Sequence, residues 1–430
     1  KTYYVGPAGS DDNPGTEGEP FASIAAALAK EDVTEVRVAA GDYATMAGMV
    51  DGSSTMKDGN FLGILRSPVK IVGAGADVVT LHCSKGAVTW SCGFLLDDAG
   101  AEVSGVTVVG STSANGQYDV GTAFHVLAGT VKDCVIRDCG SQAMSSQVRL
   151  AGADAVMQDC QIVNNVGPTN CKYCPGVTVV NGLLLRCLIS DNQGGDTSKA
   201  NGLYLSKGEV RDCIIRNCTG ANASACYGGG VYMLGGSLIG CTVTNNYNGS
   251  RYMSVNTLSA GGVYAALDAA NVKEICISNC LIAANHNYVH MGVDVSGLVL
   301  DNRLAKVYDT VIENNRGAGG PQLYMKADCL VSNCTIRDLD GNALVKQDAG
   351  TMTEDCVLDD GTASETRPAE TFVSLNGSDT APYDTPAKAA HTFDAALAAV
   401  ATKVGVTSTV FVADGEYEAA AALLEAGDFE

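Results

Sequence analysis

One position of a recurring strand motif carries side chains that could bind or process a sugar. The motif reads small residue, apolar residue, variable residue, apolar residue, as in Gly230-Val231-Tyr232-Met233. Alternate side chains of a strand point to opposite faces, so apolar neighbours that face a core place the variable residue on the outside. Down the chain this position reads Leu95, His125, Arg149, Thr178, Tyr204, Tyr232, Tyr264, Asp294 and Tyr324.

Aromatic faces pack against sugar rings, and a phenol offers hydrogen bonds to their hydroxyl groups. This chemistry predicts an exposed strip for binding glycans. Its members are His125, Arg149, Tyr204, Tyr232, Tyr264, Asp294 and Tyr324. The alternative is that tyrosine occupies the position only because it suits an exposed strand and stacks on itself.

Signatures of catalysis are sparse. A lyase needs a base that works near neutral pH and a cation that holds the carboxylate of a uronic acid, and His125 and Arg149 could supply them. A glycoside hydrolase needs two carboxylic acids, but the pairs Asp97-Asp98 and Asp359-Asp360 lack the accompanying histidine motif. The catalytic residues therefore stay unassigned, and the sequence leans against an enzyme.

The cysteines outside the repeats could serve as metal ligands or form disulfides. Cys171-Lys172-Tyr173-Cys174 is a lone pair of cysteines, and zinc would need two further ligands. Cys83 with Cys92, and Cys218 with Cys226, flank short loops and could form disulfides in an oxidising compartment. We predict no metal and no cofactor, and no motif in the sequence supports a calcium site.

A second motif, Cys-x-Ile, recurs at a nearly constant spacing. Its early steps, from Cys134 to Cys241, are 26, 27, 26 and 28 residues long. A period in this range is typical of a solenoid, in which each repeat completes its core against its neighbours. The cysteines share a strand face with aliphatic residues, so we expect buried thiols. They are Cys134, Cys160, Cys187, Cys213, Cys241, Cys280, Cys334 and Cys356, with Thr310 in the same position of one repeat.

Asparagines cluster where each Cys-x-Ile strand ends, as in Asn164-Asn165 and Asn245-Asn246. Asparagine tolerates left-handed corners, and its amide can satisfy backbone groups that a turn leaves open. Since the corners of successive coils stack, the sequence predicts a ladder of asparagines.

Two further features of the repeats bear on function. The longest coils, from Cys241 to Thr310, should bulge outward, and an enzyme would have its pocket there; they carry Tyr247, Tyr252, Asn285, His286, Tyr288 and His290. Outward positions of the Cys-x-Ile strands are apolar, which hints at lateral association. These positions are Val135, Leu188, Ile214, Leu281 and Val311.

Composition limits the partners. The chain has 430 residues, of which 46% are hydrophobic, which is ample for a core. The net charge of −21 argues against binding to nucleic acid. No run of about 20 apolar residues occurs, so we predict no membrane span.

The first 45 residues differ from the repeats and read as a cap. Ser23 is a suitable N-cap for a helical stretch from Ile24 to Lys30, followed by a strand and turn at Val36–Tyr43. With the loop Gly9–Thr16, this segment resembles the N-terminal cap of right-handed parallel β-helix proteins of the pectate-lyase-like superfamily. The repeats resemble those of large secreted and surface-displayed members. The resemblance implies the fold, and the superfamily includes lyases, hydrolases, adhesins and structural repeats.

The end of the chain repeats its beginning. Thr371-Phe372-Val373 matches Tyr3-Tyr4-Val5, and Val410–Tyr417 matches Val36–Tyr43. One interpretation is a tandem protein in which a second β-helix unit starts here; the other is that this module caps the C-terminal end. We favour the first. The expected domains are a cap at 1–45, coils at 46–361, a linker at 362–370 and the start of a second unit at 371–430.

The sequence thus predicts an all-β, right-handed parallel β-helix solenoid with a helical N-terminal cap and a second cap-like module at its C-terminal end. We expect an extracellular or cell-surface structural or adhesive module, one unit of a tandem array or fibre, whose partner is itself or the next unit. The alternatives are a polysaccharide lyase or glycoside hydrolase, and a glycan-binding module without catalysis.

Overall fold

A computed structural model describes most of the chain, which forms two compact units, Lys1–Asp360 and Gly361–Glu430. The described residues are 1–44, 46–50, 59–83, 90–111, 121–140, 146–167, 173–195, 198–220, 226–249, 258–268, 271–288, 293–317, 320–339, 341–360, 370–374, 389–390, 396 and 409–413.

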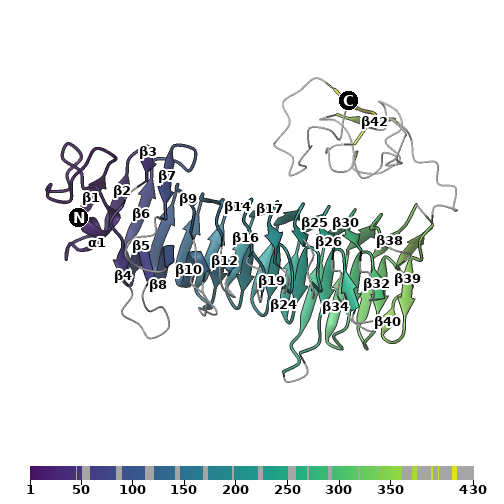
Figure 1. The fold of residues 1–430 in the computed structure, drawn as a ribbon. Coiled ribbons are helices and arrows are strands. Elements are labelled where there is room, and N and C mark those ends of the chain that lie inside the picture. The colour runs from purple at the N-terminus through teal and green to yellow at the C-terminus, as the bar shows by residue number, and fades with distance from the viewer. Residues whose placement is uncertain are drawn as a thin grey trace. The chain divides into compact units, whose positions relative to one another are not determined.

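The first unit is a parallel β-helix, as the repeats predict. Its coils stack side by side from the purple N-terminal end to the green end (Figure 1). Each central coil has four faces, which we number in chain order. Faces 1 and 2 belong to one 23-stranded sheet, face 3 is a 12-stranded sheet and face 4 is a short four-stranded sheet among the described residues.

Faces 1 and 2 are joined because two long strands, β8 and β10, run through both. The strands of face 1 are β5 (Gly59–Leu65), β8 (Trp90–Ser104), β10 (Gly121–Lys132), β12 (Ser146–Leu150), β15 (Val177–Val179), β19 (Leu203–Leu205), β23 (Val231–Met233), β28 (Val263–Ala265), β33 (Leu298–Leu300), β36 (Leu323–Met325) and β39 (Val345–Gln347). Face 2 adds β1 (Thr2–Val5), β2 (Glu35–Val38), β6 (Lys70–Gly73), β13 (Ala155–Gln158), β16 (Leu183–Leu185), β20 (Glu209–Arg211), β24 (Gly236–Ile239), β29 (Ile275–Ser278), β34 (Ala305–Tyr308), β37 (Leu330–Ser332) and β40 (Thr351–Met352).

Face 3 carries the Cys-x-Ile motif and face 4 follows the asparagines. Face 3 consists of β3 (Gly41–Tyr43), β7 (Val79–His82), β9 (Thr107–Val109), β11 (Val135–Arg137), β14 (Gln161–Val163), β17 (Leu188–Ser190), β21 (Ile214–Arg216), β25 (Thr242–Thr244), β30 (Leu281–Ala283), β35 (Val311–Glu313), β38 (Thr335–Arg337) and β41 (Val357–Asp359). Face 4 consists of β18 (Gln193–Gly194), β22 (Thr219–Gly220), β26 (Tyr247–Asn248) and β31 (His286–Asn287). Two small pairings complete the unit, β4 (Met49–Val50) with β5, and β27 (Leu258–Ala260) with β32 (Val293–Val295).

The core is a stack of aliphatic side chains in register. On face 3, Ile162 pairs with Ile189 and Ile189 with Ile215, and all three are fully buried. The alternation of apolar residues in the sequence therefore determines which side chains of each strand face the core. The outward apolar row, Val135, Leu188, Ile214, Leu281 and Val311, is half-buried on face 3; its role in lateral association stays a prediction.

Left-handed corners separate face 3 from its neighbours. Asp159 (φ 54°) precedes face 3 and Asn164 (φ 55°) follows it, and the same two positions repeat in the next coils. The residue after the second corner points inward and is buried, as the stacked asparagines Asn165, Asn192, Asn246, Asn285 and Asn315.

These buried asparagines form the predicted ladder. The Nδ2 of Asn246 donates to Oδ1 of Asn285 at 3.0 Å, and that of Asn285 to Oδ1 of Asn315 at 2.9 Å. Cys218 takes one rung, where its N–H donates to Oδ1 of Asn246. Gln322 continues the hydrogen bonds beyond Asn315: its Oε1 accepts from the N–H and Nδ2 of Asn315, and its Nε2 donates to Oδ2 of Asp338.

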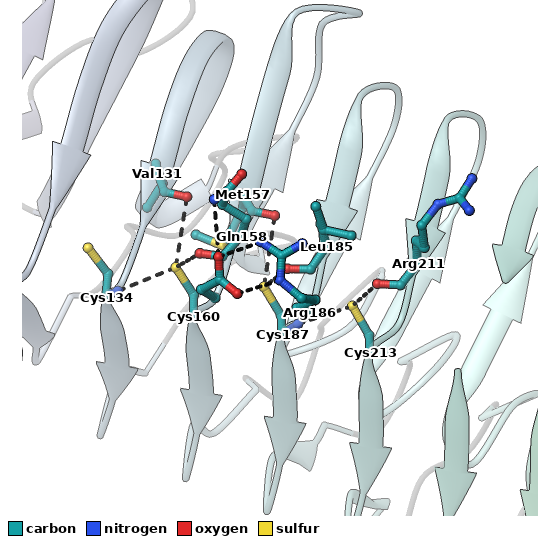
Figure 2. Close-up of polar contacts among 11 residues, drawn as sticks. Val131, Cys134, Met157, Gln158, Cys160, Leu185, Arg186, Cys187, Arg211 and Cys213 are labelled. Atoms are coloured by element: carbon teal, nitrogen blue, oxygen red, sulfur yellow. Dashed lines mark hydrogen bonds and ion pairs between the residues drawn. The ribbon is translucent and has the colours of Figure 1, made fainter. Parts of the chain in front are cut away.

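The cysteines preceding face 3 are buried thiols, as predicted, except Cys356, which is half-buried; they stack from coil to coil (Figure 2). The N–H of Cys187 donates to the sulfur of Cys213 at 3.3 Å, and each thiol donates to the carbonyl two residues before it. Burial raises the pKa of Cys160 and Cys213, so these thiols stay protonated. Cys92 and Cys218 are also thiols, so neither disulfide considered from the sequence is formed.

The N-terminal segment contains one short helix, α1 (Ile24–Leu28), which Ser23 caps by accepting from the N–H of Ala26. Ile24 and Ala27 are buried against the first strands. A helix of five residues is too small to make this segment a helical cap, so that part of the prediction is not confirmed. The rest of the segment consists of strands and turns. Within the described part of the chain, no helix is long and apolar enough to cross a membrane.

Candidate functional site

Most of the predicted glycan-binding strip lies on one column of face 1. His125 pairs with Arg149, Arg149 with Thr178 and Thr178 with Tyr204 in successive coils. The column continues through Tyr232 and Tyr264. The strand alternation therefore brings these side chains together as expected.

The tyrosines of this column are buried, which corrects the expectation of an exposed strip. Tyr204, Tyr232 and Tyr264 expose only 8%, 9% and 6% of their surface, and Tyr324 is buried as well. Their rings stack on one another, with centroids 5.6 Å apart for Tyr204 and Tyr232 and 5.7 Å apart for Tyr232 and Tyr264.

Loop residues cover the stack from outside. Tyr173 meets Tyr204 edge-on at 4.8 Å, and Tyr227 meets both Tyr232 and Tyr264 at 5.9 Å. Ala200, Leu258 and Ala260 belong to the same apolar cluster. The tyrosines point away from the interior of the β-helix, but they pack beneath loops and cannot serve as an open platform for a sugar.

Asp294 does not belong to the column. It lies on β32, which pairs with β27 through Ser259, and its side chain lies outside the described residues. Val299 takes the expected position between Tyr264 and Tyr324. The cause is a motif that occurs twice, since a strand pattern at 292–295 returns at 297–300.

His125 and Arg149 lie side by side, but His125 is buried, with 7% of its surface exposed. Its Nδ1 accepts a hydrogen bond from the N–H of Gly121 at 3.2 Å. A ring nitrogen that accepts a hydrogen bond carries no proton and could act as a base, but here the N–H of Gly121 occupies it. This pair therefore lacks the open base that a lyase would need.

Burial raises the pKa of Tyr204, Tyr232 and Tyr264 well above the ordinary value. A phenol with a raised folded-state pKa contributes fully to stability below the unfolded pKa of about 10, and this contribution is lost as the pH rises through the folded value. We expect the free energy of unfolding to fall above about pH 10 by about 1.4 kcal/mol per pH unit for each buried tyrosine. Chemical denaturation at pH 9 to 12, with phenolate absorbance, measures it. Tyr232→Phe keeps the ring and should reduce the slope by the contribution of one tyrosine, about 1.4 kcal/mol per pH unit. An unchanged slope would contradict a raised pKa at Tyr232.

An exposed column lies instead on face 4. Its backbone pairs run in register from coil to coil, and every member is exposed. We call it the face-4 column, and it consists of Val166, Gln193, Thr219, Tyr247, His286 and Arg316. Tyr288, two residues beyond His286, is also exposed, at 60% of its surface.

The asparagine ladder positions this column. Each member directly follows a ladder residue, as Tyr247 follows Asn246 and His286 follows Asn285. Since the ladder residue points inward, the next side chain must point outward. In the coil of His286 the residue after that is buried again: Nδ2 of Asn287 donates to the carbonyl oxygens of Ser259 and Val295 at 3.0 and 3.1 Å.

The column combines an aromatic ring, an imidazole and a guanidinium on adjacent rungs. The rings of Tyr247 and His286 have centroids 6.5 Å apart, and His286 pairs with Arg316 on the next coil. Partial burial and the charge of Arg316 hold the pKa of His286 below its ordinary value of 6.5, so the imidazole is neutral at pH 7. Rungs about 4.8 Å apart make a row that suits an extended chain molecule.

Sequence reasoning singled out Tyr247, His286 and Tyr288 on the long coils but missed Arg316 and the register. The signal was present, because the position after each ladder asparagine can be read down the repeats. Tyr252, His290 and Cys171 lie outside the described residues. Among the residues that are described, no group of three or more histidine, cysteine, aspartate or glutamate side chains could hold a metal ion.

Comparison with known proteins adds little about activity. No family model and no curated protein matches the sequence. Similar solved structures include a rhamnogalacturonan lyase (13% identity, TM-score 0.41, 82% of this chain and 87% of the other) and the pectate lyase Pel9A (13%, 0.41, 87% and 83%). A third is XylC in complex with xylose (9%, 0.45, 84% and 86%). With TM-scores below 0.5, these similarities carry no argument about function.

Proposed function

We propose that the first unit is an extracellular, non-catalytic module that adheres to polysaccharide through the face-4 column. The observation that carries the proposal is the exposed row Tyr247, His286 and Arg316 on consecutive coils. A tyrosine face packs on a sugar ring, and a guanidinium binds hydroxyl or carboxylate oxygens.

Rigidity supports adhesion. Tyr247 is 38% exposed, yet its backbone is fixed on both sides by Asn246 and Asn248, which are buried. The Nδ2 of Asn201 also donates to the carbonyl of Tyr247 at 3.0 Å. A side chain on a fixed backbone loses less conformational entropy when a ligand binds, so a short row of contacts can hold a polymer.

An open row also favours binding over catalysis. Enzymes that cleave glycosidic bonds by general acid–base catalysis position an acid and a base in a site from which water is largely excluded. The face-4 column lies on the outer surface and its described members include no carboxylate. Adhesion needs neither a carboxylate pair nor a cofactor.

The proposal predicts loss of binding when the column is altered. Tyr247→Ala should weaken binding to xylan and to polygalacturonate by about tenfold or more, equivalent to about 1.4 kcal/mol. Arg316→Ala should weaken binding to polygalacturonate more than to xylan, because only the former carries carboxylates. Affinity electrophoresis of the full chain through gels that contain each polymer measures both.

Tyr308→Ala is the matched control, since Tyr308 lies half-buried on the outer side of face 2. It should bind as the unaltered chain does. Equal retardation of all variants, or no retardation of the unaltered chain by any polymer in a broad panel, would refute adhesion through this column.

A second candidate is a polysaccharide lyase, favoured by the neutral His286 beside Arg316. His286 would take the proton from the carbon that bears a carboxylate held by Arg316. A carbon–carbon double bond then forms as the glycosidic oxygen leaves with its electron pair and takes a proton from water. Unsaturated products that disappear in His286→Ala would establish this function in place of adhesion.

A further inference from the structure

We propose that the second unit contains a copy of the N-terminal segment 1–43, which we call the cap, and that the second strand of this copy is built to receive a coil of another β-helix. This inference is independent of polysaccharide binding. Two strands of the second unit are described, β42 (Glu370–Val373) and β43 (Thr409–Val412). Their sequences match β1 and β2, with Val373 in the place of Val5 and Val412 in the place of Val38.

The strand pairing is the same in both segments. β1 runs parallel to β2, from Thr2 opposite Glu35 to Val5 opposite Val38. β42 runs parallel to β43 over four residues as well, from Glu370 opposite Thr409 to Val373 opposite Val412. In each segment a third piece of chain bridges the last valine of the first strand, Phe21 to Val5 and Ala390 to Val373.

The backbone hydrogen bonds around this bridge are also repeated, one for one. In each segment the N–H of the bridging residue donates to the carbonyl oxygen of the residue before the valine. The carbonyl oxygen of the bridging residue accepts from the N–H of the residue after the valine. The N–H of the residue after the second strand donates to the carbonyl oxygen of the valine. In the N-terminal segment these bonds are Phe21 N to Tyr4 O (2.9 Å), Gly6 N to Phe21 O (2.9 Å) and Ala39 N to Val5 O (2.9 Å). In the second unit they are Ala390 N to Phe372 O (2.7 Å), Ser374 N to Ala390 O (2.9 Å) and Ala413 N to Val373 O (2.9 Å).

The burial of the bridged valine and the position of one helical alanine coincide too. Val5 and Val373 are both buried. Ala27, in α1, is six residues after Phe21, and Ala396 is six residues after Ala390; both alanines are helical and fully buried. The described residues of the second unit therefore repeat the strand pairing and the bridge of residues 1–43.

The copy differs from the first cap at one edge. In the first unit, the edge of β2 that faces away from β1 pairs with β6, from Glu35 opposite Lys70 to Val38 opposite Gly73. Among the described residues of the second unit, no strand pairs with the equivalent edge of β43, and Val412 exposes 46% of its surface, whereas Val38 is buried. An open edge with an alternating apolar face is a template for a further strand.

The occupant that fits this edge is a strand of a β-helix coil, parallel to β43, with the inward apolar alternation of β6. The first unit demonstrates the required geometry, since β2 and β6 pair in this way.

Exchange of the caps tests the proposal within the full chain. Residues 1–43 are replaced by a second copy of residues 369–417, which places β43 against β6. We expect a folded chain with a melting temperature within about 5 °C of the unaltered protein. The control carries a shuffled version of the inserted segment and should lose the cooperative transition.

A second arrangement guards against a simple failure of the junction. Residues 44–140 are appended after Glu430, so that the cap copy keeps its own surroundings. If β43 receives a coil, its amide hydrogens at Val410 and Val412 should exchange at least about tenfold more slowly than in the unextended chain. Either a stable exchanged chain or slower exchange at β43 in the extended chain supports the proposal. An exchanged chain as unstable as the shuffled control, together with unchanged exchange at β43, would overturn it.

Discussion

Replacing Asn285 by leucine is expected to lower the free energy of unfolding by about 4 kcal/mol or more. Asn285 is fully buried in the middle of the ladder. Its Oδ1 accepts from both the N–H and Nδ2 of Asn246, and its Nδ2 donates to Oδ1 of Asn315 and to the carbonyl of Val243. Leucine would leave these groups without partners, and each unsatisfied buried group costs about 1–3 kcal/mol.

Asn285→Cys is the matched control, because Cys218 already occupies a rung of the same ladder and its N–H still donates to the next asparagine. Chemical denaturation should show a smaller loss for cysteine than for leucine. Since coils contact mainly their neighbours, hydrogen exchange should locate the weakening at the coils around Asn285. Equal stability of the two variants would show that the ladder's amides contribute little.

The fold was largely predictable because its repeats show in the sequence. The spacing of Cys134, Cys160 and Cys187 predicts one turn of the solenoid each, and the structure places all three in one buried column. Asparagine at the end of the Cys-x-Ile strands predicts left-handed corners, and Asn164 has φ 55°. Local patterns suffice here because each coil repeats the same short-range geometry.

The candidate site was less predictable, because exposure depends on loops that the repeat does not encode. Strand alternation correctly places Tyr232 outside the β-helix interior, but the fold of Tyr227 over it decides that it is buried. Likewise, two equivalent strand motifs precede and follow residue 296, and only the stacking on β28 selects Val299 over Asp294. Alternation predicts which side of a sheet a residue occupies, not what covers that side.

The length of α1 was overestimated for a related reason. The alanine-rich stretch after Ser23 favours a helix by propensity, and the N-cap is correct. The chain nevertheless leaves the helix after Leu28, because it must reach β2 at Glu35 in register with Thr2. Pairing with neighbouring strands sets the end of the helix, and helix propensity is only a weak prior against such contacts.

Gly262→Val is expected to destabilise the β-helix by about 3 kcal/mol, through crowding instead of lost hydrogen bonds. Gly262 precedes β28, and a Cβ atom there would lie 2.7 Å from Cγ2 of Ile282, 2.8 Å from the carbonyl oxygen of Gly297 and 3.0 Å from Nδ2 of Asn285. Because one of these atoms is backbone and another belongs to the ladder, a coil must shift to admit the side chain. Thermal and chemical denaturation measure the loss.

Gly18→Val is the control, since nothing lies within 4 Å of a Cβ atom at that exposed position. It should change the free energy of unfolding by no more than about 0.5 kcal/mol. Gly262 lies directly against the side-chain amide of Asn285, so both changes disturb the same contact. Gly262→Val combined with Asn285→Leu should therefore lower the free energy of unfolding by less than the sum of the separate losses. Full additivity would show that the packing of Asn285 is not the reason why this position requires glycine.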